Sequence, residues 1–159
     1  MKIKTLIYFI DGATWKLLDK WLEKGELPNI AKLKQGSAYG NLRSVFPPVT
    51  HAALPAFFTG KDPIKLGLFN ISEMQAAMLT SEKFIGTYLW DKLSGRKFRS
   101  LVMDIPFTYP PTPFDGVLFT GFYTPENAAD FVYPQAKAAE YPDYPKGGTE
   151  LMQYLWDKE

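Results

Sequence analysis

The 159-residue sequence contains no cysteine. Disulfide bonds, thiolate metal sites and cysteine nucleophiles are therefore excluded. Any metal ligands must be oxygen atoms or imidazole, and imidazole can supply only one, because His51 is the single histidine. A metal centre with several protein ligands would thus depend on carboxylates.

The chain also lacks a strong charge of either sign and a long apolar run. Its formal net charge is +1, from 18 basic and 17 acidic residues, which gives no electrostatic signature of nucleic-acid or membrane binding. The longest apolar run, Leu6 to Ile10, is far too short to span a bilayer, and the start lacks a signal-peptide pattern. We expect a cytoplasmic protein with neither nucleic acid nor membrane as a partner.

The chain is rich in apolar and aromatic residues, which make up 46% and 16% of the sequence. This is enough to bury one sizeable core, so we expect a single α/β domain over residues 1–159. Residues 3–10 form a nearly continuous apolar run, which predicts a central strand of a parallel sheet. The run stops at Asp11 and Gly12, where open α/β sheets place their ligands. Asp11 could be a metal ligand or only a turn or cap residue.

Two helices and a second strand are predicted next. Thr14 can cap a helix that ends at Gly25, and Pro28 opens a second helix that ends at Gly36. Residues 37–45 alternate well enough for a second strand. A strand, a helical crossover and another strand predict a right-handed βαβ-type unit.

The second strand leads into Pro47 and Pro48, which hold the approach to Thr50 extended. After Thr50 we expect a short helix that contains Pro55 in its first turn and ends at Gly60. Thr50 is then at or near a helix N-terminus, where free N–H groups and the helix dipole favour an anion. A hydroxyl there can be a nucleophile or merely a cap.

The rest of the sequence predicts the remaining elements of an α/β fold, with a mainly parallel sheet flanked by helices. Residues 88–93 predict a helix, and residues 98–105 and 117–121 predict a third and a fourth strand. The rigid aromatic loop over residues 106–111 follows the third strand and is expected to face the site. Pro134 is expected to open one helix, and apolar residues between 151 and 156 line another.

Several of these segments together resemble a known family. They are Asp11-Gly12-Ala13-Thr14, Gly25-Glu26-Leu27-Pro28-Asn29-Ile30, Pro47-Pro48-Val49-Thr50, Thr59-Gly60 and Phe107-Thr108-Tyr109-Pro110-Pro111. Their order and spacing are similar to the N-terminal part of the alkaline phosphatase superfamily, in its type I phosphodiesterase/nucleotide pyrophosphatase branch. The resemblance implies an alkaline-phosphatase-like fold, incomplete here, with this chain as the N-terminal part of a larger catalytic domain.

The resemblance also implies roles for three residues. Asp11 would bind a divalent metal, usually zinc, of which the complete family site holds two. Thr50 would be the nucleophile and bridge to the same metal, and Asn70 would contact a phosphoryl oxygen of a small phosphate ester or nucleotide. The residue types suit the chemistry, because coordination by a cation lowers the pKa of a hydroxyl.

The sequence departs from the family pattern in two places. Leu66 stands where the family often has a histidine, and the Asp-x-x-x-His, Asp-His and late His segments that complete the metal site are absent. His51 adjoins Thr50 and, one position along a helix, would point away from the metal. The resemblance therefore implies phosphoester hydrolysis or transfer through Thr50, with a site that this chain leaves incomplete.

The sequence bears on two other functions. A sulfatase needs a Cys or Ser in a C/S-x-P-x-R context, which the sequence lacks. The alternative from another class is a non-catalytic α/β module or inactive fragment that associates with its own copies. In that case Asp11 and Thr50 are only turn and cap residues.

Overall fold

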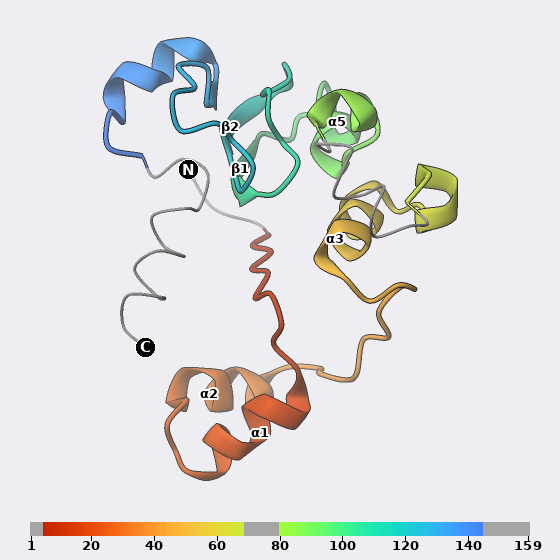
Figure 1. Cartoon of the computed structure of the whole chain (residues 1–159). Helices are drawn as coiled ribbons and strands as arrows, with labels where there is room; N and C mark the ends of the chain where they lie inside the picture. Colours follow the sequence, from red (N-terminus) through yellow and green to blue (C-terminus); the bar gives the residue numbers. More distant parts are fainter. Residues whose placement is uncertain (1–4, 69–79, 145–159) are drawn as a thin grey trace. The chain divides into compact units, whose positions relative to one another are not determined.

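The structure is a computed structural model, which describes residues 5–68 and 80–144 (Figure 1). The chain divides into two compact units, Met1–Ser44 and Val45–Glu159. Each unit is described by itself below. None of the helices within the described residues is both long and apolar enough to cross a lipid bilayer.

The first unit contains two helices, α1 (Trp15–Glu23) and α2 (Pro28–Gly36). The Thr14 hydroxyl accepts a hydrogen bond of 3.3 Å from the backbone N–H of Leu17, and Gly25 has the left-handed φ of 75° that follows a helix end. Pro28 is the first residue of α2, where its missing N–H costs nothing. Both predicted helices are confirmed.

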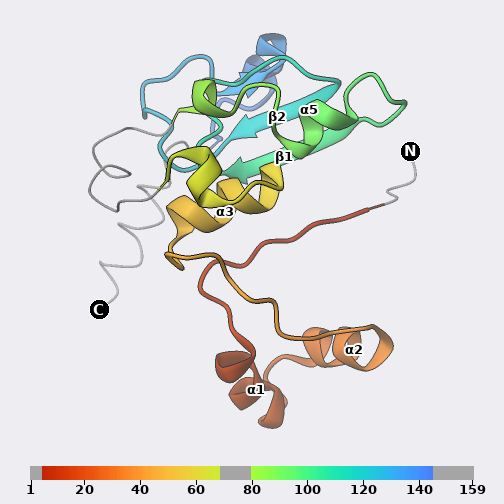
Figure 2. The same ribbon diagram turned by 90° about the vertical axis from the view of Figure 1, so that its right-hand side faces the viewer.

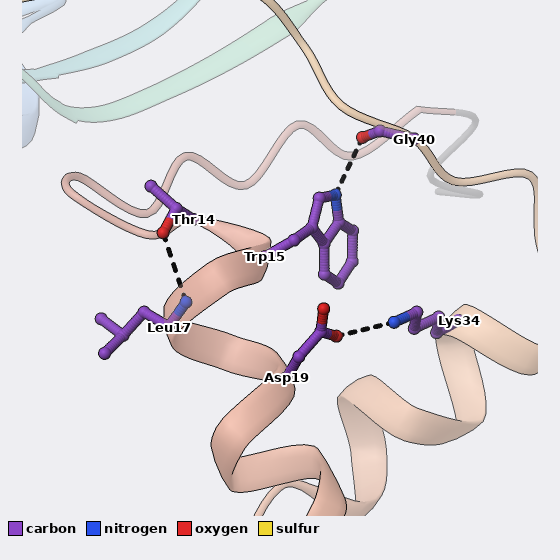
Figure 3. Close-up of polar contacts among 6 residues, drawn as sticks. All are labelled: Thr14, Trp15, Leu17, Asp19, Lys34 and Gly40. Carbon is purple, nitrogen blue, oxygen red and sulfur yellow. Dashed lines mark hydrogen bonds and ion pairs between the residues drawn. The ribbon is translucent and has the colours of Figure 1, made fainter.

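A polar and aromatic cluster connects the two helices and the chain that leaves them (Figure 3). The Lys34 ammonium lies 2.7 Å from a carboxylate oxygen of Asp19, and it sits 4.9 Å and 4.7 Å from the ring centroids of Trp15 and Tyr39. The indole N–H of Trp15 donates to the Gly40 carbonyl at 2.8 Å. No residue of α1 or α2 is buried. Surface contacts of this kind, together with partly buried apolar side chains, therefore hold this unit.

The two strands predicted in this unit are not formed. None of residues 5–10 or 37–45 is in a strand, and Leu6 and Tyr8 are 80% and 81% exposed. The predicted βαβ-type unit is therefore wrong for these described residues. An apolar run is stable as a strand only when another strand satisfies its backbone groups, and composition alone cannot supply that partner.

The second unit contains the sheet. Its elements are α3 (Thr50–Thr59), η1 (Pro63–Leu66), η2 (Ser81–Phe84), α5 (Leu89–Leu93), β1 (Ser100–Ile105), β2 (Gly116–Thr120), β3 (Val132–Tyr133) and η3 (Gln135–Glu140). The helix over residues 88–93 and the strands over residues 98–105 and 117–121 are confirmed as α5, β1 and β2. The helix expected after Pro134 is the 3-10 helix η3, and the one expected over residues 151–156 lies outside the described residues.

The described sheet is mixed, with the strand order β1-β2-β3. β1 and β2 are parallel, whereas the two-residue strand β3 is antiparallel to β2. The expectation of a mainly parallel sheet is not confirmed. β3 follows β2 without a crossover long enough for a parallel return, so it pairs in the opposite direction.

The sheet has a covered face and a second, partly covered face. Val102 of β1 and Leu118 of β2 are buried in one core with side chains from α3 and α5. The next residue of β2, Phe119, points to the other face and packs against Phe131 and Tyr144. Figure 2 shows α3 and the segment that follows β3 on opposite sides of the β1–β2 pair.

Candidate active site

Helix α3 begins at Thr50. Val49 precedes it in extended conformation (φ −120°, ψ 151°), and the Val49 carbonyl accepts hydrogen bonds from the N–H groups of Ala52 (3.0 Å) and Ala53 (2.9 Å). Val49 holds the cap position, where its side chain makes no capping hydrogen bond. Thr50 is therefore the first helical residue, half-buried, and not the cap residue of this helix.

Pro55 lies in the interior of α3 and is buried, so the expectation that it sits in a first turn is wrong. A proline lacks the N–H that would bond to the preceding turn of the helix. Its own carbonyl accepts a hydrogen bond of 2.6 Å from the Thr59 hydroxyl. Gly60 ends the helix with a φ of 68°, as predicted.

The start of α3 lies at the edge of the sheet where the parallel strands end. The ring of His51, the second residue of α3, lies 5.2 Å from the ring of Phe107 and 5.6 Å from that of Tyr123, measured between centroids. Phe107 follows the end of β1 and Tyr123 follows the end of β2. Ligands of open α/β sheets bind at this carboxyl edge. The first turn of α3, which carries Thr50, therefore lies at the edge where open α/β sheets bind their ligands.

A hydrogen bond of 2.6 Å joins the Tyr123 hydroxyl and Nε2 of His51. Burial lowers the pKa of His51 and raises the pKa of Tyr123. Both directions favour the uncharged side chain, because a partly buried site disfavours charge. The pair is therefore neutral near neutral pH.

Three non-glycine residues at this edge have a left-handed backbone. The φ values are 54° for Asp104, 66° for Phe107 and 78° for Tyr123. Asp104 is the extra residue at the register shift between β1 and β2. Such conformations cost about 1–3 kcal/mol each and persist only where the surrounding structure holds them.

Hydrogen bonds around a buried threonine stabilise these left-handed conformations. The Thr108 hydroxyl donates to the Ile105 carbonyl at 2.6 Å and accepts from the Gly121 N–H at 3.2 Å. The loop after β1 is thus bonded to the loop after β2. The Tyr88 hydroxyl in turn donates to the Phe107 carbonyl at 2.8 Å.

Gly121 allows the two loops to approach closely. A Cβ atom at this position would lie 2.5 Å from the carbonyl carbon of Asp104 and 2.6 Å from the carbonyl carbon and oxygen of Ile105. These are backbone atoms that cannot rotate away. Only glycine therefore fits between the ends of β1 and β2 in this arrangement.

The predicted site residues fall in different parts of the chain. Asp11 belongs to the first unit, where it is exposed in a turn that the Ala13 N–H closes onto the Ile10 carbonyl at 3.3 Å. Thr50 belongs to the second unit. A cation shared by Asp11 and Thr50 stays a prediction, and Asn70 lies outside the described residues.

The described residues do not provide a complete metal site. Within residues 5–68 and 80–144, no three His, Cys, Asp or Glu side chains are grouped so that they could hold an ion. The Nε2 atom of His51 is already bonded to Tyr123. A catalytic zinc ion needs about three protein ligands, so this donor set does not fit one on its own.

The sequence placed the loop after β1 near Thr50 but did not single out Tyr123. Residues 106–111 were expected to face the site, and Phe107 does lie beside His51, next to Thr50. The ring of Tyr123 stacks on that of Phe107 at 5.2 Å, with 18° between the planes. Its position just after a predicted strand was the available signal, since the ends of parallel strands meet at one edge.

The family model described as Type I phosphodiesterase / nucleotide pyrophosphatase matches residues 5–148. Neither a curated protein nor a solved structure gave a significant match. The matched range covers most of the sequence, including Asp11, Thr50 and the sheet. The chain therefore belongs to the type I phosphodiesterase/nucleotide pyrophosphatase family of the alkaline phosphatase superfamily.

Proposed function

We propose that Thr50 is the nucleophile in the hydrolysis or transfer of a small phosphate ester or nucleotide, and that Asp11 is a ligand of a divalent metal, expected to be zinc. The family is one of phosphodiesterases and nucleotide pyrophosphatases. The observation that supports the role of Thr50 best is its place as the first residue of α3, at the carboxyl edge of the parallel strands.

The reaction has two steps. The Thr50 oxygen attacks phosphorus, the ester P–O bond breaks, and the leaving alcohol takes up a proton while the Thr50 hydroxyl gives one up. Water then attacks phosphorus and breaks the bond to Thr50, which regains its proton. The N-terminal amides of α3 can stabilise the negative oxygens of the transferring group.

Trapping the covalent intermediate tests Thr50. The protein is incubated with bis(p-nitrophenyl) phosphate and zinc, quenched in acid and mapped by mass spectrometry. We expect little turnover, with an adduct on Thr50 that Thr50→Ser retains and Thr50→Val loses. Thr50→Val is the matched change because it keeps the shape and removes the hydroxyl. An adduct on another residue, or unchanged turnover in Thr50→Val, would overturn the assignment.

Zinc titration by calorimetry tests Asp11. The family is generally dependent on divalent metals, but the described residues supply too few ligands for tight binding. We expect weak binding that Asp11→Asn abolishes and Glu23→Gln, an exposed carboxylate on α1, leaves unchanged. Binding that survives Asp11→Asn would exclude Asp11 as a ligand.

A second function, self-association as a non-catalytic α/β module, is favoured by one observation. β1 is at the edge of the described sheet, and its residues Leu101 and Met103 are 65% and 51% exposed. An edge strand offers unpaired backbone groups to another copy, and two exposed apolar side chains would be buried by that pairing. Sedimentation should then show a dimer that Met103→Lys disrupts, and a monomer at all concentrations would rule this function out.

A further inference from the structure

The side chain of His51 has an environment unlike that of an ordinary exposed helical residue. It contacts rings from two loops, and each of these rings stands on a left-handed backbone, at Phe107 and Tyr123. Left-handed non-glycine residues are costly and gather where a particular geometry is needed. Here both of them bring an aromatic ring to the first turn of α3.

The direction of the hydrogen bond in this cluster depends on the tautomer of the imidazole, because a phenol can either donate or accept. A neutral phenol carries a proton to donate, and a neutral imidazole has one nitrogen that can accept it. The 2.6 Å contact is made through Nε2. With Tyr123 as donor, the imidazole proton must be on Nδ1, which is the less favoured tautomer of a free histidine in water.

We propose that Tyr123 is a positioning residue for Thr50: its hydroxyl donates to Nε2 of His51 and so holds the first turn of α3 against the carboxyl edge of the sheet. His51 is adjacent to Thr50 in the helix, so its ring and the Thr50 hydroxyl move with the same turn. The catalytic meaning of this inference rests on the function proposed for Thr50, whereas the hydrogen bond itself does not.

The imidazole tautomer is the first test. Because His51 is the only histidine, a long-range ¹H–¹⁵N spectrum of the labelled chain at pH 7.5 contains one imidazole. We expect the Nδ1–H tautomer in the unmodified chain and the Nε2–H tautomer in Tyr123→Phe. The matched control is Tyr109→Phe, which removes a hydroxyl bonded to Asp130 at 2.9 Å and should leave the Nδ1–H tautomer in place. The Nε2–H tautomer in the unmodified chain would overturn the inference.

Amide exchange is the second test, because it reports on the turn that carries Thr50. The N–H groups of Ala52 and Ala53 bond to the Val49 carbonyl, so they exchange when the first turn opens. We expect Tyr123→Phe to raise their exchange rates roughly two- to tenfold, as the loss of one hydrogen bond predicts. Unchanged rates at both amides would show that Tyr123 does not hold the turn. A variant that fails to fold would lose protection throughout the second unit rather than at this turn alone.

These readouts separate the inference from the proposed function. If Tyr123→Phe changes the tautomer and the exchange rates but no adduct forms on Thr50 in the unmodified chain, the positioning of the turn stands and the nucleophile assignment fails. If the adduct forms and Tyr123→Phe changes neither readout, the inference fails and the nucleophile assignment stands. Thr50→Val should leave the His51 tautomer unchanged, since it keeps the hydroxyl of Tyr123 that bonds to Nε2.

Discussion

The Tyr88 hydroxyl, just before α5, donates a hydrogen bond of 2.8 Å to the carbonyl of Phe107, just after β1. Tyr88 is almost fully buried, and its ring stacks on that of Trp90 with 4.3 Å between centroids. This bond anchors the loop after β1, which places the Phe107 ring beside His51. It also satisfies a backbone carbonyl that the core shields from water.

Tyr88→Phe should destabilise the protein by about 1–2 kcal/mol, because it leaves the Phe107 carbonyl without its donor while the ring packing is kept. Urea denaturation followed by circular dichroism measures the loss. Tyr109→Phe is the control, since the Tyr109 hydroxyl bonds to the side chain of Asp130 near solvent, where water can replace it. An equal loss in both variants would contradict the anchoring role of Tyr88.

Gly121→Ala should lower the free energy of unfolding by more than about 2 kcal/mol. The added methyl group would meet backbone atoms of Asp104 and Ile105 at 2.5–2.6 Å, so the ends of β1 and β2 would have to move apart. Gly40→Ala is the matched control, because its Cβ would meet nothing within 4 Å and its φ is not left-handed. The comparison is made by thermal unfolding. Similar melting temperatures for Gly121→Ala and the unmodified chain would show that the two loops can separate at little cost.

Removing the charge of Lys34 should weaken the contacts that connect α1, α2 and Tyr39 in the first unit. The Asp19 hydrogen bond raises the pKa of Lys34, so the side chain is a cation at neutral pH, and it lies over the rings of Trp15 and Tyr39. In the unmodified chain, the Cε protons of Lys34 should be shifted upfield by the two rings. Asp19→Asn should reduce that shift, and Lys34→Met should change the fluorescence of Trp15.

Lys32→Met is the control for Lys34, because Lys32 is an exposed residue of the same helix. It should alter neither signal. An unshifted Cε resonance in the unmodified chain would rule out the ring contacts in solution.

Tyr144 should make the stability depend on alkaline pH. Burial, and then the nearby Asp104 carboxylate, raise the pKa of Tyr144 from 10.0 to about 12. Between these values the unfolded chain loses the proton while the folded chain keeps it, so this contribution to stability is full below pH 10 and is lost as the pH rises through 12. The loss of stability between pH 9 and pH 11 should therefore be smaller in Tyr144→Phe than in the unmodified chain. Equal pH dependence in both would contradict the shift.

The absorbance of tyrosinate near 295 nm checks the same group directly. The difference between the titrations of the unmodified chain and Tyr144→Phe should have its midpoint at about 12. A difference midpoint near 10 would place the Tyr144 ring in solvent, against its stacking on Phe131 at 5.6 Å.

The sequence by itself determined the parts of the fold that depend on neighbours within one turn. Thr14, Pro28 and Gly60 each act on backbone groups a few residues away, and each stands at the helix boundary it predicts. The sequence pattern also identified the family to which the chain belongs, because the order of short motifs can be recognised without knowledge of their contacts.

The tertiary structure decided which apolar segments became strands and which side chains met. Residues 5–10 and β1 are similarly apolar, yet only β1 has a strand beside it and forms a ladder. His51 meets Tyr123 although 72 residues separate them. The position of Tyr123 after a predicted strand indicates an edge of the sheet but not this partner. The physical reason is that a helix cap is satisfied by the chain's own adjacent atoms, whereas strand pairing and ring contacts depend on packing between segments that are remote in sequence.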